Sequence, residues 1–300
     1  MGKFLWKKEI ALGIAFLFFC LAVGVSTAGQ KTNVRHDVVP SDGFGLHSVL
    51  NIEWSQNATY DPLPPDSTLR LITLNITYWT THGPFFYRMI LLYCQLTHQT
   101  ITVNLDVRDT PSWCTATLQN TQLPFLISET QVTQHTTLLV AVDEHAPAFE
   151  PFLITLYASV DTMIGPFGLL PFVYGFEIDR KIGFVPGYRA QITVTPESNF
   201  LETTPGTSVT DLITVENLGN GKTLVNIQIV DLPQNWVVII DPSQLILEMN
   251  ERKITRLIVT PPFGYYGVAT ILLSFTPRSY YHPEYTGEPH FLHIVVEVKP

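Results

Sequence analysis

Alternation of apolar and polar positions dominates the chain after residue 30. One clear case has Ile72, Leu74, Ile76 and Tyr78 in an apolar row, with Thr73, Asn75 and Thr77 between them. A period of two is typical of a β-strand that buries one face. Similar segments, separated by Pro, Gly, Asn and Asp, predict strands near residues 47–54, 69–79, 88–96, 101–107, 115–127, 137–142, 152–160, 173–178 and 189–194.

The second half of the chain alternates more regularly. Its apolar rows are Val225, Ile227 and Ile229; Ala269, Ile271, Leu273 and Phe275; and Leu292, Ile294, Val296 and Val298. Asn217-Leu218-Gly219-Asn220-Gly221 is a strong turn between two such segments. About seven strands in roughly 100 residues match the size of an immunoglobulin-like sandwich. We therefore predict an all-β fold with two β-sandwich (immunoglobulin-like) domains, residues 30–195 and 196–300.

The N-terminus carries an export pattern. Lys3, Lys7 and Lys8 precede an uncharged stretch, residues 10–30, whose apolar part is residues 10–25. Ser26-Thr27-Ala28 then supplies the small residues that a signal peptidase reads. Residues 1–28 are predicted to be a signal peptide cleaved after Ala28, with an uncleaved N-terminal membrane anchor helix as the alternative. Both place the protein outside the cytoplasmic membrane.

The low content of charged residues and the negative net charge limit the kinds of partner that the chain can bind. Only 14% of residues are charged, and the formal net charge is -9. A nucleic-acid interface needs a dense basic patch, and the sequence has no cluster of Lys and Arg of that kind. We expect no nucleic acid as partner and no cofactor.

Two cysteines remain if the signal segment is removed. Cys94 and Cys114 would meet an oxidising compartment outside the cell, which favours a disulfide between them. The alternative is a pair of buried thiols.

Two sequons agree with export. Asn57-Ala58-Thr59 and Asn75-Ile76-Thr77 are acceptors for N-glycosylation. Asn75 is expected to face solvent, because it belongs to the polar row of its strand. The tripeptides leave the occupancy of both sites open.

The last third of the chain carries a recognisable set of turns and core positions. They are Pro205-Gly206, Val215-Glu216-Asn217-Leu218-Gly219-Asn220, Leu232-Pro233-Gln234-Asn235-Trp236 and Val259-Thr260-Pro261-Pro262 followed by Gly267. Residues from about Thr203 to Pro300 thus resemble the NEW3 (alpha-galactosidase-associated) family of immunoglobulin-like domains, found beside glycosidases and in archaeal and bacterial surface proteins. The resemblance implies a sandwich with its Trp against the core, in a cell-surface setting and without catalytic residues. Residues 280–289 depart from the family as an insertion-like loop.

Candidate chemistry gathers near the C-terminus. His282, Glu284, His290 and His293 are weak candidates for a metal site, since their spacing fits no regular ligand pattern and a solvated surface explains them as well. Tyr265, Tyr266, Tyr280, Tyr281 and Tyr285 lie in predicted loops, where tyrosines can form platforms for sugars or protein partners. The alternative is that these tyrosines pack on the ends of the sandwich.

An uncharged run in the middle of the chain, residues 162–176, is too short and too broken by Gly and Pro to cross a bilayer. We expect it to pack between the two domains; if exposed, it would contact a partner or a membrane surface.

These patterns predict an exported, non-enzymatic surface module with structural, adhesive or binding roles toward envelope glycans or surface proteins. The alternatives are a secreted carbohydrate-active enzyme with an accessory sandwich, and a subunit of a membrane-anchored envelope assembly.

Overall fold

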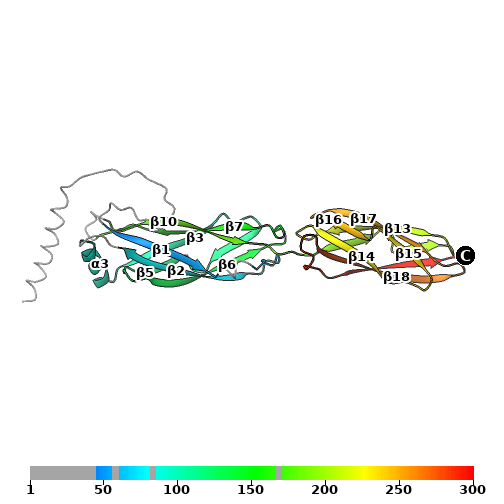
Figure 1. Cartoon of the computed structure of the whole chain (residues 1–300), viewed down its shortest axis with the longest axis horizontal. Coiled ribbons are helices and arrows are strands. Elements are labelled where there is room, and N and C mark those ends of the chain that lie inside the picture. The colour runs from blue at the N-terminus through cyan, green and yellow to red at the C-terminus, as the bar shows by residue number, and fades with distance from the viewer. Residues whose placement is uncertain (1–44, 56–60, 82–85, 166–170) are drawn as a thin grey trace, which may run out of the picture. The chain divides into compact units, whose positions relative to one another are not determined.

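The structure is a computed structural model that describes residues 45–300 except 56–60, 82–85 and 166–170. Those residues are mostly β-strand and form four sheets. The sheets pair face to face into two sandwiches that follow one another along the chain (Figure 1). The predicted β-rich character of the chain is confirmed. The proposed signal or anchor, residues 1–28, lies outside the described residues.

The first sandwich contains a six-stranded sheet and a four-stranded sheet. The larger sheet has the order β4-β6-β2-β1-β9-β8, with bounds Cys114–Leu118, Val132–Val142, Arg70–Thr81, Leu46–Trp54, Pro171–Tyr174 and Met163–Ile164. The smaller sheet has the order β10-β7-β3-β5, with bounds Phe176–Phe184, Phe152–Val160, Thr100–Arg108 and Gln122–Leu126. Most neighbouring strands are antiparallel, as expected for strands with one solvated face.

Alternation in β2 sets which face is buried. Ile72, Leu74, Ile76 and Tyr78 are buried, while Thr73 between the first two is exposed. The Tyr78 ring packs 5.5 Å from Phe125 of the opposite sheet. The apolar row predicted for this strand is therefore the row that fills the space between the two sheets.

One segment predicted as a strand is a helix. Residues 86–96 form α3 (Phe86–Leu96), the single helix in the part of the chain that the structure describes. Its inner side carries Tyr87, Ile90, Leu91 and Cys94, of which Leu91 and Cys94 are fully buried. Spacings of three and four place these residues on one face of a helix. A strand prediction missed this period because the whole segment is apolar and offers no alternation to test.

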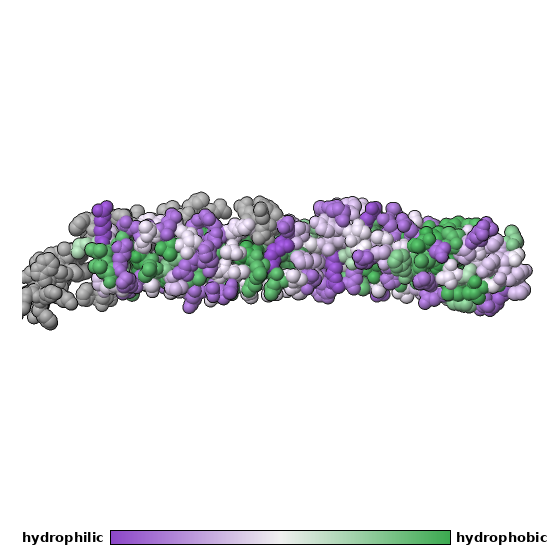
Figure 2. Space-filling view, turned by 90° about the horizontal axis from the view of Figure 1, so that it is seen from below, coloured by the Kyte–Doolittle hydropathy of each residue, from purple (hydrophilic) through white to green (hydrophobic). Residues whose placement is uncertain are grey.

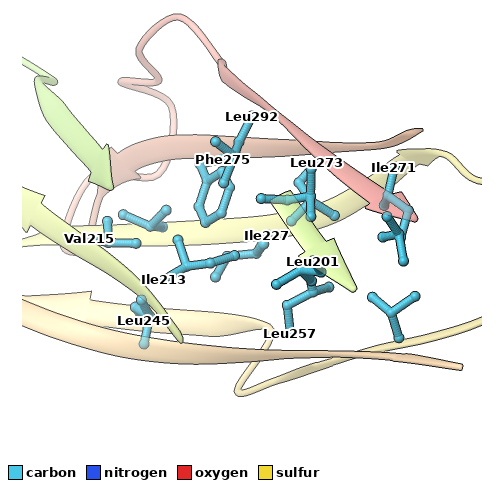
Figure 3. Close-up of a cluster of buried hydrophobic side chains, with 14 of the residues drawn as sticks. Leu201, Ile213, Val215, Ile227, Leu245, Leu257, Ile271, Leu273, Phe275 and Leu292 are labelled. Carbon is cyan, nitrogen blue, oxygen red and sulfur yellow. The ribbon is translucent and has the colours of Figure 1, made fainter. Parts of the chain in front are cut away.

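The second sandwich has two sheets that share one core. The first has the order β11-β13-β17-β15, with bounds Ile192–Pro196, Val209–Asn217, Arg252–Thr260 and Val237–Asp241. The second has the order β12-β19-β18-β14-β16, with bounds Phe200–Thr203, His290–Val298, Gly267–Ser279, Thr223–Asp231 and Gln244–Leu247. Figure 3 shows Ile213, Val215 and Leu257 of one sheet facing Ile227, Leu273 and Phe275 of the other. The inward rows predicted for β14, β18 and β19 are the rows in this core.

Two boundaries differ from the sequence prediction. The predicted division between residues 195 and 196 falls inside β11, which pairs with β13 and so belongs to the second sandwich. The expected strand at 115–127 is two strands, β4 and β5, joined by a turn at residues 119–121. Asn120 and the strand ends beside it are polar, a signal that favours a turn over a continuous strand.

The described residues contain no helix long and apolar enough to cross a membrane.

Candidate functional site

The turn that joins β13 to β14 is built on a buried asparagine. The side-chain amide of Asn217 donates to the carbonyls of Gly221 and Glu248, at 2.9 and 3.0 Å. Its side-chain oxygen accepts from the Gly219 N–H. A Cβ on Gly219 would lie 2.3 Å from the Arg189 carbonyl oxygen, so the close approach of the linker requires glycine there. The turn predicted from residues 217–221 is confirmed, and its role extends beyond reversing the chain.

A second asparagine in the same turn joins the two sandwiches. Asn220 is 2% exposed, and its amide donates to the carbonyls of Ala146 and Gly187 at 2.8 Å each. Its side-chain oxygen accepts from the Arg189 N–H at 2.7 Å. The Ala148 N–H also donates to the Asn220 backbone carbonyl. One side chain thus satisfies three backbone groups from both the first sandwich and the linker.

Aromatic packing surrounds this junction. Phe149 lies 4.3 Å from the His282 ring and 5.1 Å from the Tyr285 ring, measured between ring centroids. An ion pair between Arg189 and Glu144 lies nearby, and the guanidinium lowers the pKa of the Glu144 carboxyl below its ordinary value. The insertion-like loop at 280–289 therefore supplies packing at the junction.

Three of the five candidate tyrosines belong to that loop. Tyr285 packs on Phe149, whereas Tyr280 and Tyr281 contact one another edge to face. The Lys222 ammonium lies 5.0 Å from the Tyr280 ring, a cation–π arrangement. Tyr281 remains the most exposed of the three.

Tyr265 and Tyr266 lie at the other end of the second sandwich, before β18 begins. Tyr266 directly precedes Gly267, the first residue of β18, and Tyr280 directly follows Ser279, the last. Gly267 and Ser279 are twelve positions apart, which corresponds to roughly 40 Å along the strand. The five tyrosines thus divide between opposite ends of this sandwich. Tyr265 packs edge to face on the buried Trp236, at 5.2 Å, and its hydroxyl donates to the Val268 carbonyl. Tyr266 is 60% exposed.

Exposed apolar side chains surround Tyr266. Phe263 is 90% exposed, an unusual value for a phenylalanine. We call Leu232, Val237, Phe263, Tyr266 and Val268 the apolar tip; all five are large, apolar or aromatic, and exposed. Figure 2 shows hydrophobic residues gathering toward this end of the second sandwich.

Three charged groups near the apolar tip pair with one another. Lys299 contacts Glu202 at 2.7 Å and Glu297 at 3.1 Å. Both carboxylates and the ammonium lie close to where β19 and β12 end. The tip therefore offers exposed apolar area to a partner, and these three charges compensate one another.

The candidate metal ligands do not form a cluster. His282 contacts Glu284 at 3.3 Å in the β18–β19 loop, while His290 opens β19 opposite Phe275 and His293 lies further along it opposite Leu272. No group of three or more potential ligands that could hold a metal ion occurs among the residues that the structure describes.

The cysteines are two buried free thiols, so the predicted disulfide is not formed. Cys94 lies in α3, near Tyr78, whose ionisation it affects. Cys114 pairs with Val142, at the end of the sheet where Val140 pairs with Arg70. Cys94 is thus near the Tyr78 end of β2, and Cys114 is near the Arg70 end. Arg70 and Tyr78 are eight positions apart, which corresponds to roughly 27 Å along the strand, whereas the Cα atoms of a disulfide lie within about 7 Å. Burial raises the pKa of each thiol to about 11.

The sequon at Asn75 lies on the outer row of β2, as expected, and is half-buried. The Asn75 side-chain oxygen lies 2.8 Å from Nδ1 of His135 on the neighbouring strand β6. Asn57 lies outside the described residues.

The uncharged run at 162–176 does not pack between the sandwiches where it is described. Its described parts form β8 and β9, and β9 pairs with the start of β1. Phe172 contacts Tyr93 of α3 edge to face, at 5.7 Å. The contacts between sandwiches come instead from residues 144–149 and 187–190, which the sequence analysis did not single out.

Helix α3 presents a second apolar face that the sequence analysis also missed. Met89, Leu92, Tyr93 and Leu96 are all exposed, at spacings of three and four. The same segment therefore carries one apolar stripe toward the core and another toward solvent.

Comparison with known proteins yields only distant structural matches. No family model and no curated protein matches the chain. Among solved structures, the D00-D0 domain of Intimin aligns at 8% identity over 83% of this chain and 99% of its own, with a TM-score of 0.34. The E. coli chaperone DraB aligns at 9% identity over 82% of this chain and 98% of its own, with a TM-score of 0.26. The ASH/PapD-like domain 7 of human CEP192 aligns at 10% identity over 35% of this chain and 84% of its own, with a TM-score of 0.29. Matches with TM-scores this low carry no argument about fold, function or partners.

Proposed function

We propose that the protein is an exported, non-catalytic surface module that binds another component of the cell envelope through the apolar tip. The exposure of Phe263 on a rigid sandwich end is the observation that carries the proposal. A phenylalanine that is 90% exposed leaves nearly all of its ring in water, and partner binding would remove that ring from water.

The surroundings of the tip support a preorganised contact. Trp236 is buried in the core, and the Tyr265 ring packs against it. Tyr265 belongs to the loop that carries Phe263 and Tyr266, so this contact holds the loop on the core. Phe263 also lies against Gly206, where an added Cβ would come within 2.4 Å of its ring. A fixed aromatic group loses little conformational freedom on binding, which favours affinity.

Export and envelope location enter the proposal from the N-terminal pattern and the sequons. N-terminal sequencing and intact mass of the protein from its native cells test this part. A mature chain that starts at Gly29 supports secretion, and an intact Met1 in the membrane fraction supports the anchored form. Recovery of the whole chain in the cytoplasm would contradict both.

Binding of the purified chain to isolated native envelopes tests the tip. We expect a Phe263→Ala/Tyr266→Ala variant to lose at least about tenfold in affinity, since truncating a central aromatic group typically costs 2 kcal/mol or more. Phe291→Ala is the matched control, because Phe291 is also an exposed phenylalanine of this sandwich but lies opposite Ser274, in the middle of β18.

Treatment of the envelopes with protease or with periodate then distinguishes protein partners from glycan partners. Equal binding by the wild type, the tip variant and the Phe291 control would remove the tip from the binding surface and overturn the proposal.

A further inference from the structure

The outward stripe of α3 is the largest apolar feature at its end of the first sandwich. Leu92 is 55% exposed and Leu96 is 73% exposed, with Met89 and Tyr93 beside them. The helix is already fixed to the core by Leu91 and Cys94 on its opposite face. Folding of the chain therefore does not require the outward residues to be apolar, and in water their exposure is unfavourable.

Helix α3 and the segments that flank it in sequence carry little charge. No acidic residue occurs between Asp66 and Asp106, and Arg88 is the one basic residue within α3. On a helical wheel Arg88 and Gln95 fall on the same flank, to one side of the stripe. The helix itself can approach an apolar phase with no carboxylate of its own to desolvate.

More apolar residues are exposed at the same end. Leu126 pairs with Thr100, just after α3, and is 52% exposed. Ile164 of β8 pairs with Pro171 and is 61% exposed. Tyr93, at the edge of the stripe, has the amphipathic ring that is enriched at the interface between membrane and water.

This end is also where the chain enters the first sandwich. β1 begins at Leu46, paired with Val173 of β9, and Phe172 beside it contacts Tyr93 of α3 (Figure 1). Residues 26–45 connect β1 to the apolar segment 10–25, and twenty residues cannot exceed roughly 70 Å even when fully extended. If residues 10–25 are anchored, this length limits how far the first sandwich can move from the bilayer.

We propose that the outward face of α3 lies on the lipid bilayer in which residues 10–25 are anchored. The inference rests on the anchored form of the proposed function. A short amphipathic helix of this size binds lipid weakly alone, but tethering raises its effective concentration at the membrane to about the millimolar range. Met89, Leu92 and Leu96 enter the interface, and Tyr93 lies at the level of the headgroups.

The experiment uses the full chain, in a Cys20→Ala background, reconstituted in phosphatidylcholine vesicles. A nitrobenzoxadiazole label is attached through Leu96→Cys, and through His145→Cys as a control at the opposite end of the first sandwich, where the His145 side chain is exposed. The parent chain without an added cysteine checks that the buried Cys94 and Cys114 take no label.

We expect the label at position 96 to shift to the blue, to lose quenching by iodide and to be quenched by doxyl lipids, while the label at position 145 stays aqueous. Adding Met89→Ser and Leu92→Ser should return the position-96 label to water. A chain that floats with the vesicles but keeps an aqueous label at position 96 would overturn the inference and leave the anchor in place.

Two other outcomes also contradict the inference, each in its own way. A chain that does not float with the vesicles has no membrane anchor. This result would contradict both the anchored form of the proposed function and the contact of α3 with the bilayer. A disulfide-linked dimer through position 96 of the unlabelled variant would show that a second copy of the chain covers α3 instead.

Discussion

The buried side chains of Asn217 and Asn220 contribute more to the stability of this fold than its surface ion pairs. Asn217 closes its own turn, and Asn220 satisfies backbone groups of Ala146, Gly187 and Arg189 that would otherwise be buried without partners. Surface ion pairs such as that of Arg108 with Asp106 involve exposed side chains and contribute little to stability. The turn signal predicted that a reversal occurs at 217–221, but not that one of its residues reaches into another domain.

Replacing Asn220 by Ala should therefore destabilise the chain by about 3 kcal/mol, since two carbonyls and one N–H lose their hydrogen-bond partners in a buried site. Urea unfolding measures the effect as a lowered midpoint. Asn199→Ala, at an exposed position, is the control and should change the free energy of unfolding by less than about 0.5 kcal/mol. If the two variants unfold at the same urea concentration, the junction is not held by Asn220.

Buried acids in the first sandwich predict a loss of stability at alkaline pH. Burial raises the pKa of Cys94 and Cys114 to about 11 and the pKa of Tyr78 to about 12, from ordinary values of 9.0 and 10.0. The stability that these protonated groups contribute is complete below the unfolded-state pKa and is lost as pH rises through the folded-state pKa. Urea midpoints should fall between pH 9 and 12, and less so in a Cys94→Ala/Cys114→Ala variant. A midpoint that stays constant over this range would contradict the burial of these groups.

Elements differ in how well their sequences specify them. β7 was predicted with the bounds it has, because Phe152, Ile154, Leu156, Ala158 and Val160 alternate with outward residues between clear breaks. α3 was missed because Met89 to Cys94 is apolar without interruption, and period cannot be judged where no polar residue marks a face. Phe263 and Tyr266 of the apolar tip could be placed in a loop from the neighbouring Pro262 and Gly264. Their exposure depends on which segments meet at one end of the sandwich.

Adjacent leucines in α3 test the two faces directly. Leu91→Ala should destabilise the chain by about 3 kcal/mol, because Leu91 is buried against the first sandwich. Leu92→Ala should change the free energy of unfolding by less than about 0.5 kcal/mol, because Leu92 faces solvent. Circular dichroism during urea titration separates the two. Equal destabilisation by Leu91→Ala and Leu92→Ala would mean that residues 86–96 do not form α3 with these two opposite faces.

At the scale of the whole chain, the two sandwiches carry different exposed surfaces. The first exposes an apolar helix face beside the point where the N-terminal segment enters, and the second exposes the apolar tip away from the junction. Such a division suits a module that is held at one surface and contacts a partner at another. Among the described residues, neither surface carries a group of three or more His, Cys, Asp or Glu side chains that could hold a metal ion.

Photo-crosslinking in native cells tests the central claim, that the apolar tip contacts a component of the envelope. A benzophenone amino acid is placed at Phe263 in one variant and at Phe291 in another, and both are irradiated on intact cells. We expect one discrete adduct from position 263 that is absent from position 291. Its yield should fall when unlabelled wild-type protein is added as a competitor. No adduct from position 263, or the same adducts from both positions, would contradict it.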